Sequence, residues 1–442
     1  MKNYVLALFT VIPALLFSQT ITTIAGTGLS TYNGEGLSAT ATNLGNIGTL
    51  ALNSNNELIF PTSLQHLIRK LDSNGIITIV AGIPESQGYN GDNILASNAT
   101  LYNPNSIAID GFGNILISDF GNCRIRKIDT NGIITTIAGN GDCVSSGDFG
   151  LAVQARIRYP QYISIDMQGN IYFSESGFHK VRKIDTSGII TTIAGTGIAG
   201  YNGDGILATN AQINFPVGIA VDSQGNVFIA EHFGHRIRKI DTNGIISTIA
   251  GTGIAGFNGN NIQANTAQIN RPQGMKIDTQ GNLYFADSYN NRIRKINTNG
   301  VITTIAGMGL QGYTGDGGSA LSAMLDRPYD MLFDTNGNMY ISDNFNYRIR
   351  KVTNVLGNDD FTISEGDVAL APNPSANGFT TVYFPELVDE IKVFDLLGQI
   401  VLSENAQGKD HIEIYLPNSG VYLVTFYSAG ATITKKLLVG QN

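Results

Sequence analysis

The stretch RIRKIDTNGIITTIAG, Arg124 to Gly139, recurs along the chain at a fixed interval. Three close copies each end 56 residues after the one before (139 to 195, 195 to 251, 251 to 307). A looser copy ends at Gly82, and a bare ITTIAG ends at Gly26. A period of some tens of residues is typical of a solenoid or a propeller rather than of one irregular domain.

One interval, from Gly195 to Gly251, predicts the content of each repeat. It opens with a long glycine-rich connection and continues as VGIAVD, VFIAE, RIRKID and IISTIAG. The turns DSQGN, HFGH and TNG separate these four runs. Short runs rich in Ile, Val and Phe between Asp, Asn and Gly turns predict four antiparallel strands, the first to fourth strands of a blade.

The ends of the repeat array predict a closed ring. The repeat stops after RIRKV, Arg348 to Val352, without its fourth run, while ITTIAG stands alone at Ile21 to Gly26. The leading strand can therefore complete the last blade, which leaves no open sheet edge. We expect an all-β, six-bladed propeller over residues 20–354, with first-strand centres at Ala51, Ala108, Ser164, Ala220, Lys276 and Leu332.

The second to third strands with their turns, DSQGNVFIAEHFGHRIRKIDTNG, resemble the NHL repeat family of β-propellers. All six copies fit the pattern in spacing, turn residues and strand character. The connection that carries YNGDG makes each repeat longer than the shorter NHL form.

The net charge bears on the class of partner, and the first residues bear on the location of the protein. The net charge is −8 with scattered basic residues, which argues against nucleic acid as a partner. Residues 1–19 have a lysine, an apolar run and Ser18-Gln19, the pattern of a secretory signal peptide. No comparable apolar run follows, so we expect an exported chain without a transmembrane span.

The period disappears after residue 354. A polar linker over residues 355–367 leads to short alternating strands over residues 368–442, which predict a small β-sandwich. The segments Pro372-Asn373-Pro374, VFDLLGQ, SGVYLV and KKLLVG resemble the C-terminal sorting domain (type A) of type IX secretion cargo from Bacteroidetes. This resemblance implies the type IX machinery as a partner, removal of the domain, and a final location outside the cell or on its surface. A carbohydrate-binding or adhesive sandwich is the alternative.

Each of five blades carries an acid at the end of its second strand and a cation five residues later. Joint loss of both in the first blade, where Thr62 and Leu67 stand instead, suggests that they are partners. We expect structural ion pairs, with a ligand role as the alternative. The pairs are Asp119–Arg124, Glu175–Lys180, Glu231–Arg236, Asp287–Arg292 and Asp343–Arg348.

Cys123 and Cys143 are the two cysteines of the chain. One lies between second and third strands and the other in the next long connection, so both belong to the same face of a propeller. In an exported protein this placement predicts a disulfide, with two free thiols as the alternative.

The sequence predicts no cofactor and no metal site. The acids of the YNGDG-like loops, taken as Asp92, Asp142, Asp204 and Asp316, stand singly among glycines, whereas calcium requires six to eight oxygens. We expect these acids to cap tight turns, and calcium bound jointly with backbone carbonyls is the alternative.

The face with long loops is the expected binding face. Candidate binding residues around the axial mouth are Arg158, Arg271, Arg327, Tyr329 and Asp330, which could hold a sugar or an anionic group. The first-strand centres lack acids and histidines, and no catalytic or metal-ligand motif occurs. The sequence therefore favours a non-enzymatic module that binds an extracellular glycan or protein, and a hydrolase or lyase at the axial mouth is the alternative.

Overall fold

The computed structural model of the chain describes residues 19–353 and, beyond them, 355–356, 369–371, 373, 375, 379–383, 390–395, 398–406, 411–428 and 431–440. The predicted signal peptide, except Gln19, and most of the predicted linker lie outside the described residues. The chain divides into two compact units, one with the repeats and one with the strands that follow.

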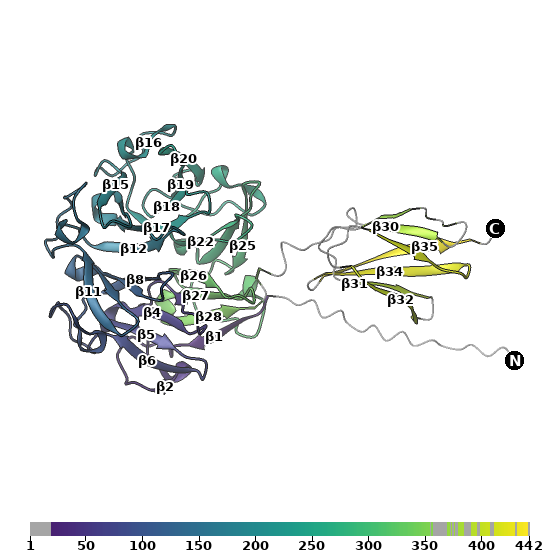
Figure 1. The fold of residues 1–442 in the computed structure, drawn as a ribbon, viewed down its shortest axis with the longest axis horizontal. Coiled ribbons are helices and arrows are strands. Elements are labelled where there is room, and N and C mark those ends of the chain that lie inside the picture. The colour runs from purple at the N-terminus through teal and green to yellow at the C-terminus, as the bar shows by residue number, and fades with distance from the viewer. Residues whose placement is uncertain are drawn as a thin grey trace. The chain divides into compact units, whose positions relative to one another are not determined.

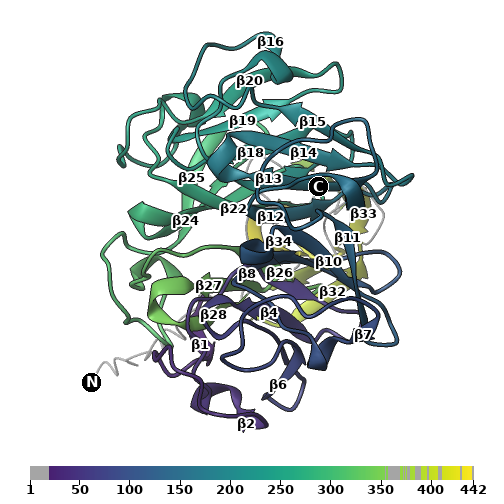
Figure 2. The ribbon, with the colours of Figure 1, turned by 90° about the vertical axis from the view of Figure 1, so that its left-hand side faces the viewer.

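Six antiparallel sheets form the first unit, and each repeat supplies most of one sheet. In Figure 1 the first strands β8, β12, β17, β22 and β26 gather in the middle of this unit, and short strands such as β2 and β16 lie at its periphery. This arrangement is the expected propeller. Figure 2 shows the same blades from the side.

The strands follow in chain order within each blade. Blade 1 has β2 (Leu37–Ser38), β3 (Ala51–Leu52), β4 (Leu58–Thr62), β5 (Leu67–Leu71) and β6 (Ile76–Ala81). Blade 2 has β7 (Ile94–Leu95), β8 (Pro104–Ile109), β9 (Ile115–Asp119), β10 (Arg124–Ile128) and β11 (Ile133–Ala138). Blade 3 has β12 (Pro160–Ile165), β13 (Ile171–Glu175), β14 (Lys180–Ile184) and β15 (Ile190–Ala194).

The remaining blades repeat this order. Blade 4 has β16 (Ile206–Leu207), β17 (Pro216–Val221), β18 (Val227–Glu231), β19 (Arg236–Ile240) and β20 (Ile245–Ala250). Blade 5 has β21 (Ile262–Gln263), β22 (Pro272–Ile277), β23 (Leu283–Asp287), β24 (Arg292–Ile296) and β25 (Val301–Ala306). Blade 6 has β26 (Met331–Phe333), β27 (Met339–Asp343), β28 (Arg348–Val352) and, from the other end of the repeats, β1 (Ile21–Ala25).

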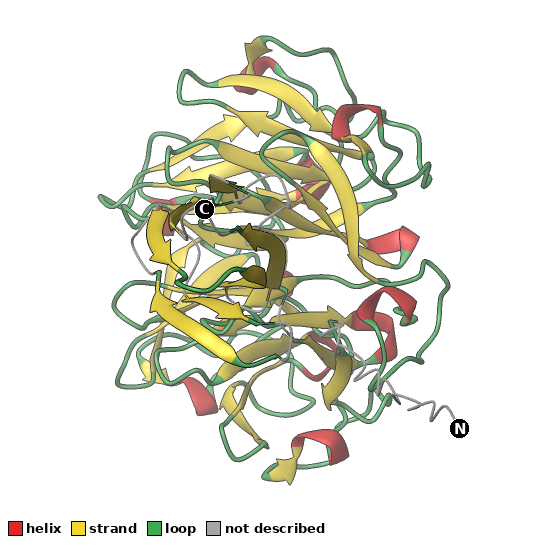
Figure 3. Ribbon diagram, turned by 90° about the vertical axis from the view of Figure 1, so that its right-hand side faces the viewer, coloured by secondary structure: helices red, strands yellow, loops and turns green. Residues whose placement is uncertain are grey.

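Helical structure in the described residues is confined to single 3₁₀ turns, drawn red in Figure 3. Six lie in the long connections, where the recurring alanines pack inward: η1 (Ala39–Ala41), η3 (Ala96–Asn98), η5 (Ala152–Gln154), η7 (Ala208–Asn210), η8 (Ala264–Thr266) and η10 (Ala320–Ser322). Five lie between second and third strands: η2 (Ser63–Gln65), η4 (Phe120–Asn122), η6 (Ser176–Phe178), η9 (Ser288–Asn290) and η11 (Asn344–Asn346).

The ring closes as the ends of the array predict. Strand β1 pairs antiparallel with β28, with Ile21 opposite Val352 and Thr23 opposite Arg350. One apolar cluster joins Ala25 and Ile349 of blade 6 to Phe60 of blade 1. The core of the propeller therefore lies between neighbouring blades, including across the seam.

The second unit contains two antiparallel sheets. One has the order β29 (Ala369–Ala371), β30 (Phe379–Tyr383) and β33 (His411–Tyr415). The other has the order β32 (Ile400–Asn405), β31 (Glu390–Phe394), β34 (Gly420–Ser428) and β35 (Ala431–Val439). Their inner side chains, among them Val382, Ile414 and Phe426, form one core, which makes a small sandwich.

Ile21→Ala tests the closure of the ring. Ile21 is fully buried, so we expect the substitution to lower the free energy of unfolding by about 2–5 kcal/mol, as measured in urea. Thr22→Ala on the exposed side of the same strand is the control and has little effect. Equal stability of the two variants would contradict the role of β1 in closing the ring.

Candidate functional site

A fully buried arginine stands in the third strand of every blade: Arg69, Arg126, Arg182, Arg238, Arg294 and Arg350. The acid at the end of the second strand pairs with this arginine. In blade 4, Glu231 Oε1 lies 3.0 Å from Arg238 Nη1, and in blade 3, Glu175 Oε2 lies 3.1 Å from Arg182 Nη1. A bulge in the fourth strand lies opposite the arginine in each case.

The predicted ion pairs therefore have the wrong cation. Asp119 and Arg124 are opposite each other in the ladder, yet the acid pairs with Arg126. Arg124 instead donates to the carbonyl oxygens of Asn122 and Asn140. The arrangement recurs as Glu175 with Arg182 and not Lys180, Glu231 with Arg238 and not Arg236, Asp287 with Arg294 and not Arg292, and Asp343 with Arg350 and not Arg348.

The acid of the long connection supplies the second partner of the buried arginine. Asp204 Oδ1 lies 2.8 Å from Arg238 Nη2, and Asp92 and Asp316 pair likewise with Arg126 and Arg350. These acids are thus ion-pair partners, whereas the sequence predicted turn caps. Asp148, not Asp142, is the equivalent acid of blade 3, because Asp148 contacts Arg182 while Asp142 pairs at the surface with Arg156.

Burial changes the pKa of the acids in these pairs. It raises the pKa of Glu231 to about 7 and that of Asp119 and Asp343 to about 6, while the adjacent guanidinium groups oppose the shift. Nowhere in the described ranges do three His, Cys, Asp or Glu side chains come together as metal ligands would.

A second repeated contact joins neighbouring blades. The residue after each turn between second and third strands has a left-handed backbone. In four of the six blades its side chain accepts a hydrogen bond from the next blade. His66 Nδ1, His179 Nδ1 and His235 Nδ1 accept from backbone N–H groups at 3.1–3.2 Å. Cys123 occupies this position in blade 2 and forms a disulfide with Cys143.

The axis is closed by side chains from opposite blades. Tyr329 of blade 6 reaches Asn105 and Gln161, with its hydroxyl 3.2 and 3.3 Å from their amide nitrogens. Below it, Tyr162 donates to Asp330 Oδ1 at 3.1 Å. Tyr329 and Asp330 are therefore buried, at 5% and 0% exposure, and their predicted place at an accessible mouth is wrong.

Two of the predicted arginines come together on the loop face. Arg271 lies 4.1 Å from the ring centre of Tyr289, and Arg327 lies 4.8 Å from the same ring. Phe233 flanks Arg271 at 5.0 Å and Phe345 flanks Arg327 at 4.4 Å, and both phenyl rings are more than 40% exposed. We call these five residues the Arg–aromatic surface.

The remaining predicted arginine, Arg158, lies over Tyr159 and Phe178 and contacts no member of this surface through its guanidinium. In the described part of the chain, no carboxylate forms an ion pair with Arg158, Arg271 or Arg327. The sequence did not reveal the aromatic partners, because these lie in the turns between second and third strands, distant along the chain from the arginines that they contact.

His232 lies beneath the Arg–aromatic surface, packed against Phe215, Phe233 and Tyr289. Its Nδ1 atom has no hydrogen-bond partner. Burial, with a smaller contribution from Arg271, lowers the pKa of His232 to about 3.

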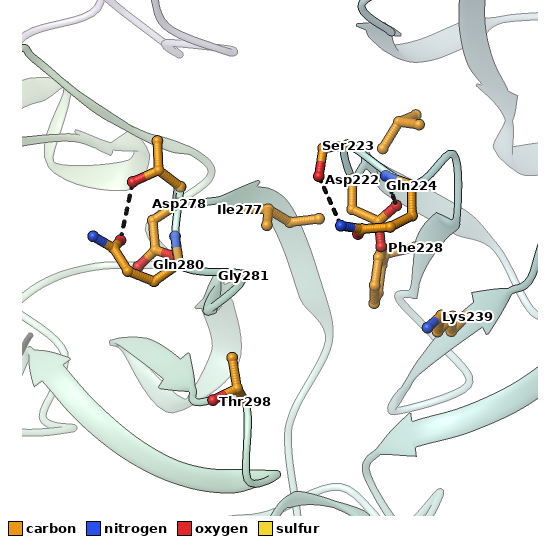
Figure 4. Close-up of a pocket in the computed structure, with 12 residues that line it drawn as sticks. Asp222, Ser223, Gln224, Phe228, Lys239, Ile277, Asp278, Gln280, Gly281 and Thr298 are labelled. Atoms are coloured by element: carbon orange, nitrogen blue, oxygen red, sulfur yellow. Dashed lines mark hydrogen bonds between the residues drawn. The ribbon is translucent and has the colours of Figure 1, made fainter.

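The face with tight turns carries grooves between blades. One of 630 Å³ lies between blades 4 and 5, and Figure 4 shows Phe228, Lys239 and the turn residues Asp222 and Asp278 around it. A similar groove of 550 Å³ lies between blades 2 and 3, with Leu116 in place of Phe228. The turn acids bond their own turns, as Asp222 does to the backbone of Gln224 and Asn226.

The model of the teneurin NHL domain matches residues 80–146, 140–200, 199–257 and 254–311, more than half of the chain. The chain belongs to the teneurin NHL domain family. A second model, the secretion system C-terminal sorting domain, matches residues 369–440 of this NHL protein. The domain indicates export to the cell surface or the extracellular space by type IX secretion. None of the helices in the described residues has the length and apolar character of a membrane-spanning helix.

Individual proteins agree with the family. Teneurin-4 of Mus musculus is 28% identical over 279 residues, and Teneurin-1 of Gallus gallus is 31% identical over 264 residues. These matches cover 56% and 53% of this chain, which spans about a tenth of each teneurin.

Among solved structures, a protein of unknown function from Bacteroides thetaiotaomicron has a TM-score of 0.56 at 18% identity, with 76% of each chain covered. An auxiliary nutrient binding protein from Bacteroides ovatus has the same score and coverage at 16% identity. Both support the fold of the NHL propeller.

Arg238→Met tests the assignment of the ion pair. The change leaves Glu231 buried without a cation, so we expect a loss of about 3–5 kcal/mol in the free energy of unfolding. Arg236→Met, which removes bonds to two carbonyl oxygens and the contact with Tyr201 but no ion pair, costs much less. The double variant with Glu231→Met regains part of the loss. Larger destabilisation by Arg236→Met would restore the pairing expected from sequence.

His232→Phe tests the buried histidine through pH. Because the folded pKa is lowered, the unfolded chain binds a proton more readily, and the wild type loses stability as pH falls below about 6.5. We expect the wild type to lose about 2 kcal/mol relative to the variant between pH 7 and pH 5. Comparison with the variant cancels the buried acids, whose raised pKa values act in the opposite direction.

Urea unfolding at the two pH values measures this difference. Phe233→Leu is the control, because it changes the packing around His232 without removing a titratable group. A difference between wild type and His232→Phe that does not change with pH would contradict a low pKa for His232.

Proposed function

We propose that this exported NHL propeller is a non-enzymatic binding protein that holds an acidic glycan on its Arg–aromatic surface. The observation that carries the proposal is the alternation of Phe233, Arg271, Tyr289, Arg327 and Phe345, with two guanidinium groups on one tyrosine ring. Neither guanidinium has an acidic partner among the described residues.

The chemistry of this surface suits a sugar acid. A guanidinium presents a planar set of donors that matches a carboxylate or a sulfate in two parallel hydrogen bonds. Stacking on Tyr289 restricts both arginines before a ligand arrives, which lowers the entropy lost on binding. The exposed rings of Phe233 and Phe345 offer apolar faces to the apolar side of a sugar ring.

The closed axis favours binding over catalysis. The alternative, a hydrolase or lyase at the axial mouth, requires an acid or a phenol that reaches the substrate, and Asp330 and Tyr329 are buried instead. One solved protein with this fold is named a nutrient binding protein, in agreement with a binding role. Removal of the signal peptide and of the sorting domain, and release or surface attachment afterwards, complete the proposed route.

An array of acidic and neutral glycans, probed with the full chain, tests the proposal. We expect binding to uronic or sulfated glycans that weakens as salt screens the charges. We expect Arg271→Gln and Arg327→Gln each to lower the affinity about tenfold or more. Arg271→Lys also binds more weakly than the wild type, because lysine keeps the charge but lacks the planar donors.

Arg156→Gln is the matched control, since Arg156 is an exposed arginine outside the Arg–aromatic surface. Its affinity stays at the wild-type value. Equal loss in the control, or a preference for neutral glycans, would refute the proposed site.

A further inference from the structure

A small well opens on the propeller axis at the face with tight turns. It has a volume of 390 Å³, in the range of small-molecule sites. Its wall comes from the ends of first strands in five blades, among them β8, β12 and β22, which Figure 1 places around the middle of the propeller. The lining is Leu50, Ala51, Leu52, Ile107, Ala108, Ile109, Ile163, Ser164, Ile165, Lys276, Leu332 and Phe333.

Lys276 is the one charged residue in this lining, and all others except Ser164 are apolar. Its side chain is 34% exposed, so the ammonium group is neither fully buried nor extended into bulk water. Lys276 is ion-paired with the buried Asp330, which lies outside this lining. A lysine at the edge of a lining of apolar residues favours an occupant with negative charge at one end and apolar surface elsewhere.

The hydrogen bonds around Lys276 leave donor capacity toward the well. Lys276 Nζ donates to the hydroxyl of Tyr162 at 3.1 Å. Lys276 Nζ lies 3.7 Å from Asp330 Oδ2, which makes an ion pair but is too long for a hydrogen bond. An ammonium group has three donors, so this one keeps capacity for a further acceptor.

Asp330 does not depend on Lys276 for its hydrogen bonds. The backbone N–H of Leu50 donates to Oδ2 at 3.0 Å, and Tyr162 donates to Oδ1 at 3.1 Å. The buried carboxylate and phenol lie outside the lining of the well, and they position the ammonium group at its edge.

We propose that the axial well binds a small carboxylate with an apolar tail. The carboxylate accepts a hydrogen bond from Lys276 Nζ, and the tail lies against first-strand side chains such as Ala108 and Ile163. The site faces away from the Arg–aromatic surface, because first strands end at the tight turns. It is therefore independent of the proposed glycan site.

Calorimetric titration of the full chain with sodium octanoate and with neutral 1-octanol tests the proposal. We expect octanoate to bind more tightly than octanol. Lys276→Met lowers the affinity for octanoate about 10- to 100-fold, the range of a hydrogen bond to a charged group, and leaves that for octanol nearly unchanged. Circular dichroism checks that the variant is folded.

Ala108→Phe fills the well without touching the charged groups, and it abolishes binding of both compounds. Lys239→Met is the matched control, because Lys239 lies on the same face, in the groove between blades 4 and 5. We expect this variant to bind octanoate with the wild-type affinity. The proposal is overturned if octanoate fails to bind, if Ala108→Phe leaves its binding intact, or if Lys276→Met weakens both compounds equally.

Discussion

A buried arginine held by carboxylates is the interaction on which each blade depends. A guanidinium without water is unstable unless charge and hydrogen bonds replace the solvent. In blade 4, Glu231 from the second strand and Asp204 from the long connection approach Arg238 together. The arginine therefore holds the long connection in one conformation through this ion pair.

The residues of the YNGDG motif also stabilise the buried arginine and the long connection. Its tyrosine covers the guanidinium groups, as Tyr201 does over Arg236 and Arg238. Its asparagine ties the ends of the connection, with Asn202 bonded to Asn210 and Gln212. In blade 1 the second strand ends in Thr62 and supplies no acid. The buried Arg69 still has one carboxylate partner, because Glu35 of the long connection lies 3.2 Å from it.

Closure of the axis divides the propeller into two faces with different chemistry. Tyr329 and Tyr162 cross the channel from opposite blades, so a ligand on one face does not reach the other through the axis. The loop face presents arginines stacked on aromatic rings, while the opposite face presents an apolar well with one lysine. A net charge of −8 does not prevent either site, because both depend on a few cations held in fixed positions.

The sequence by itself determined the architecture. Its period fixed the blades, and the unmatched ITTIAG predicted the seam between β1 and β28, because a strand pattern records which edges need partners. It also indicated the sorting domain and placed Cys123 and Cys143 on one face. Arg271 and Arg327 were recognised as candidates, although their common partner Tyr289 was not.

Only the tertiary structure decided which side chains meet. A ladder position gives the residue opposite on the paired strand, Arg124 for Asp119. The ion pair depends on where the side chains extend, and Asp119 pairs with Arg126 instead. The sequence does not predict the burial of Asp330 and Tyr329, because that burial depends on side chains from the opposite half of the ring. Local pattern specifies strands and turns, whereas contacts between distant repeats arise only when the ring closes.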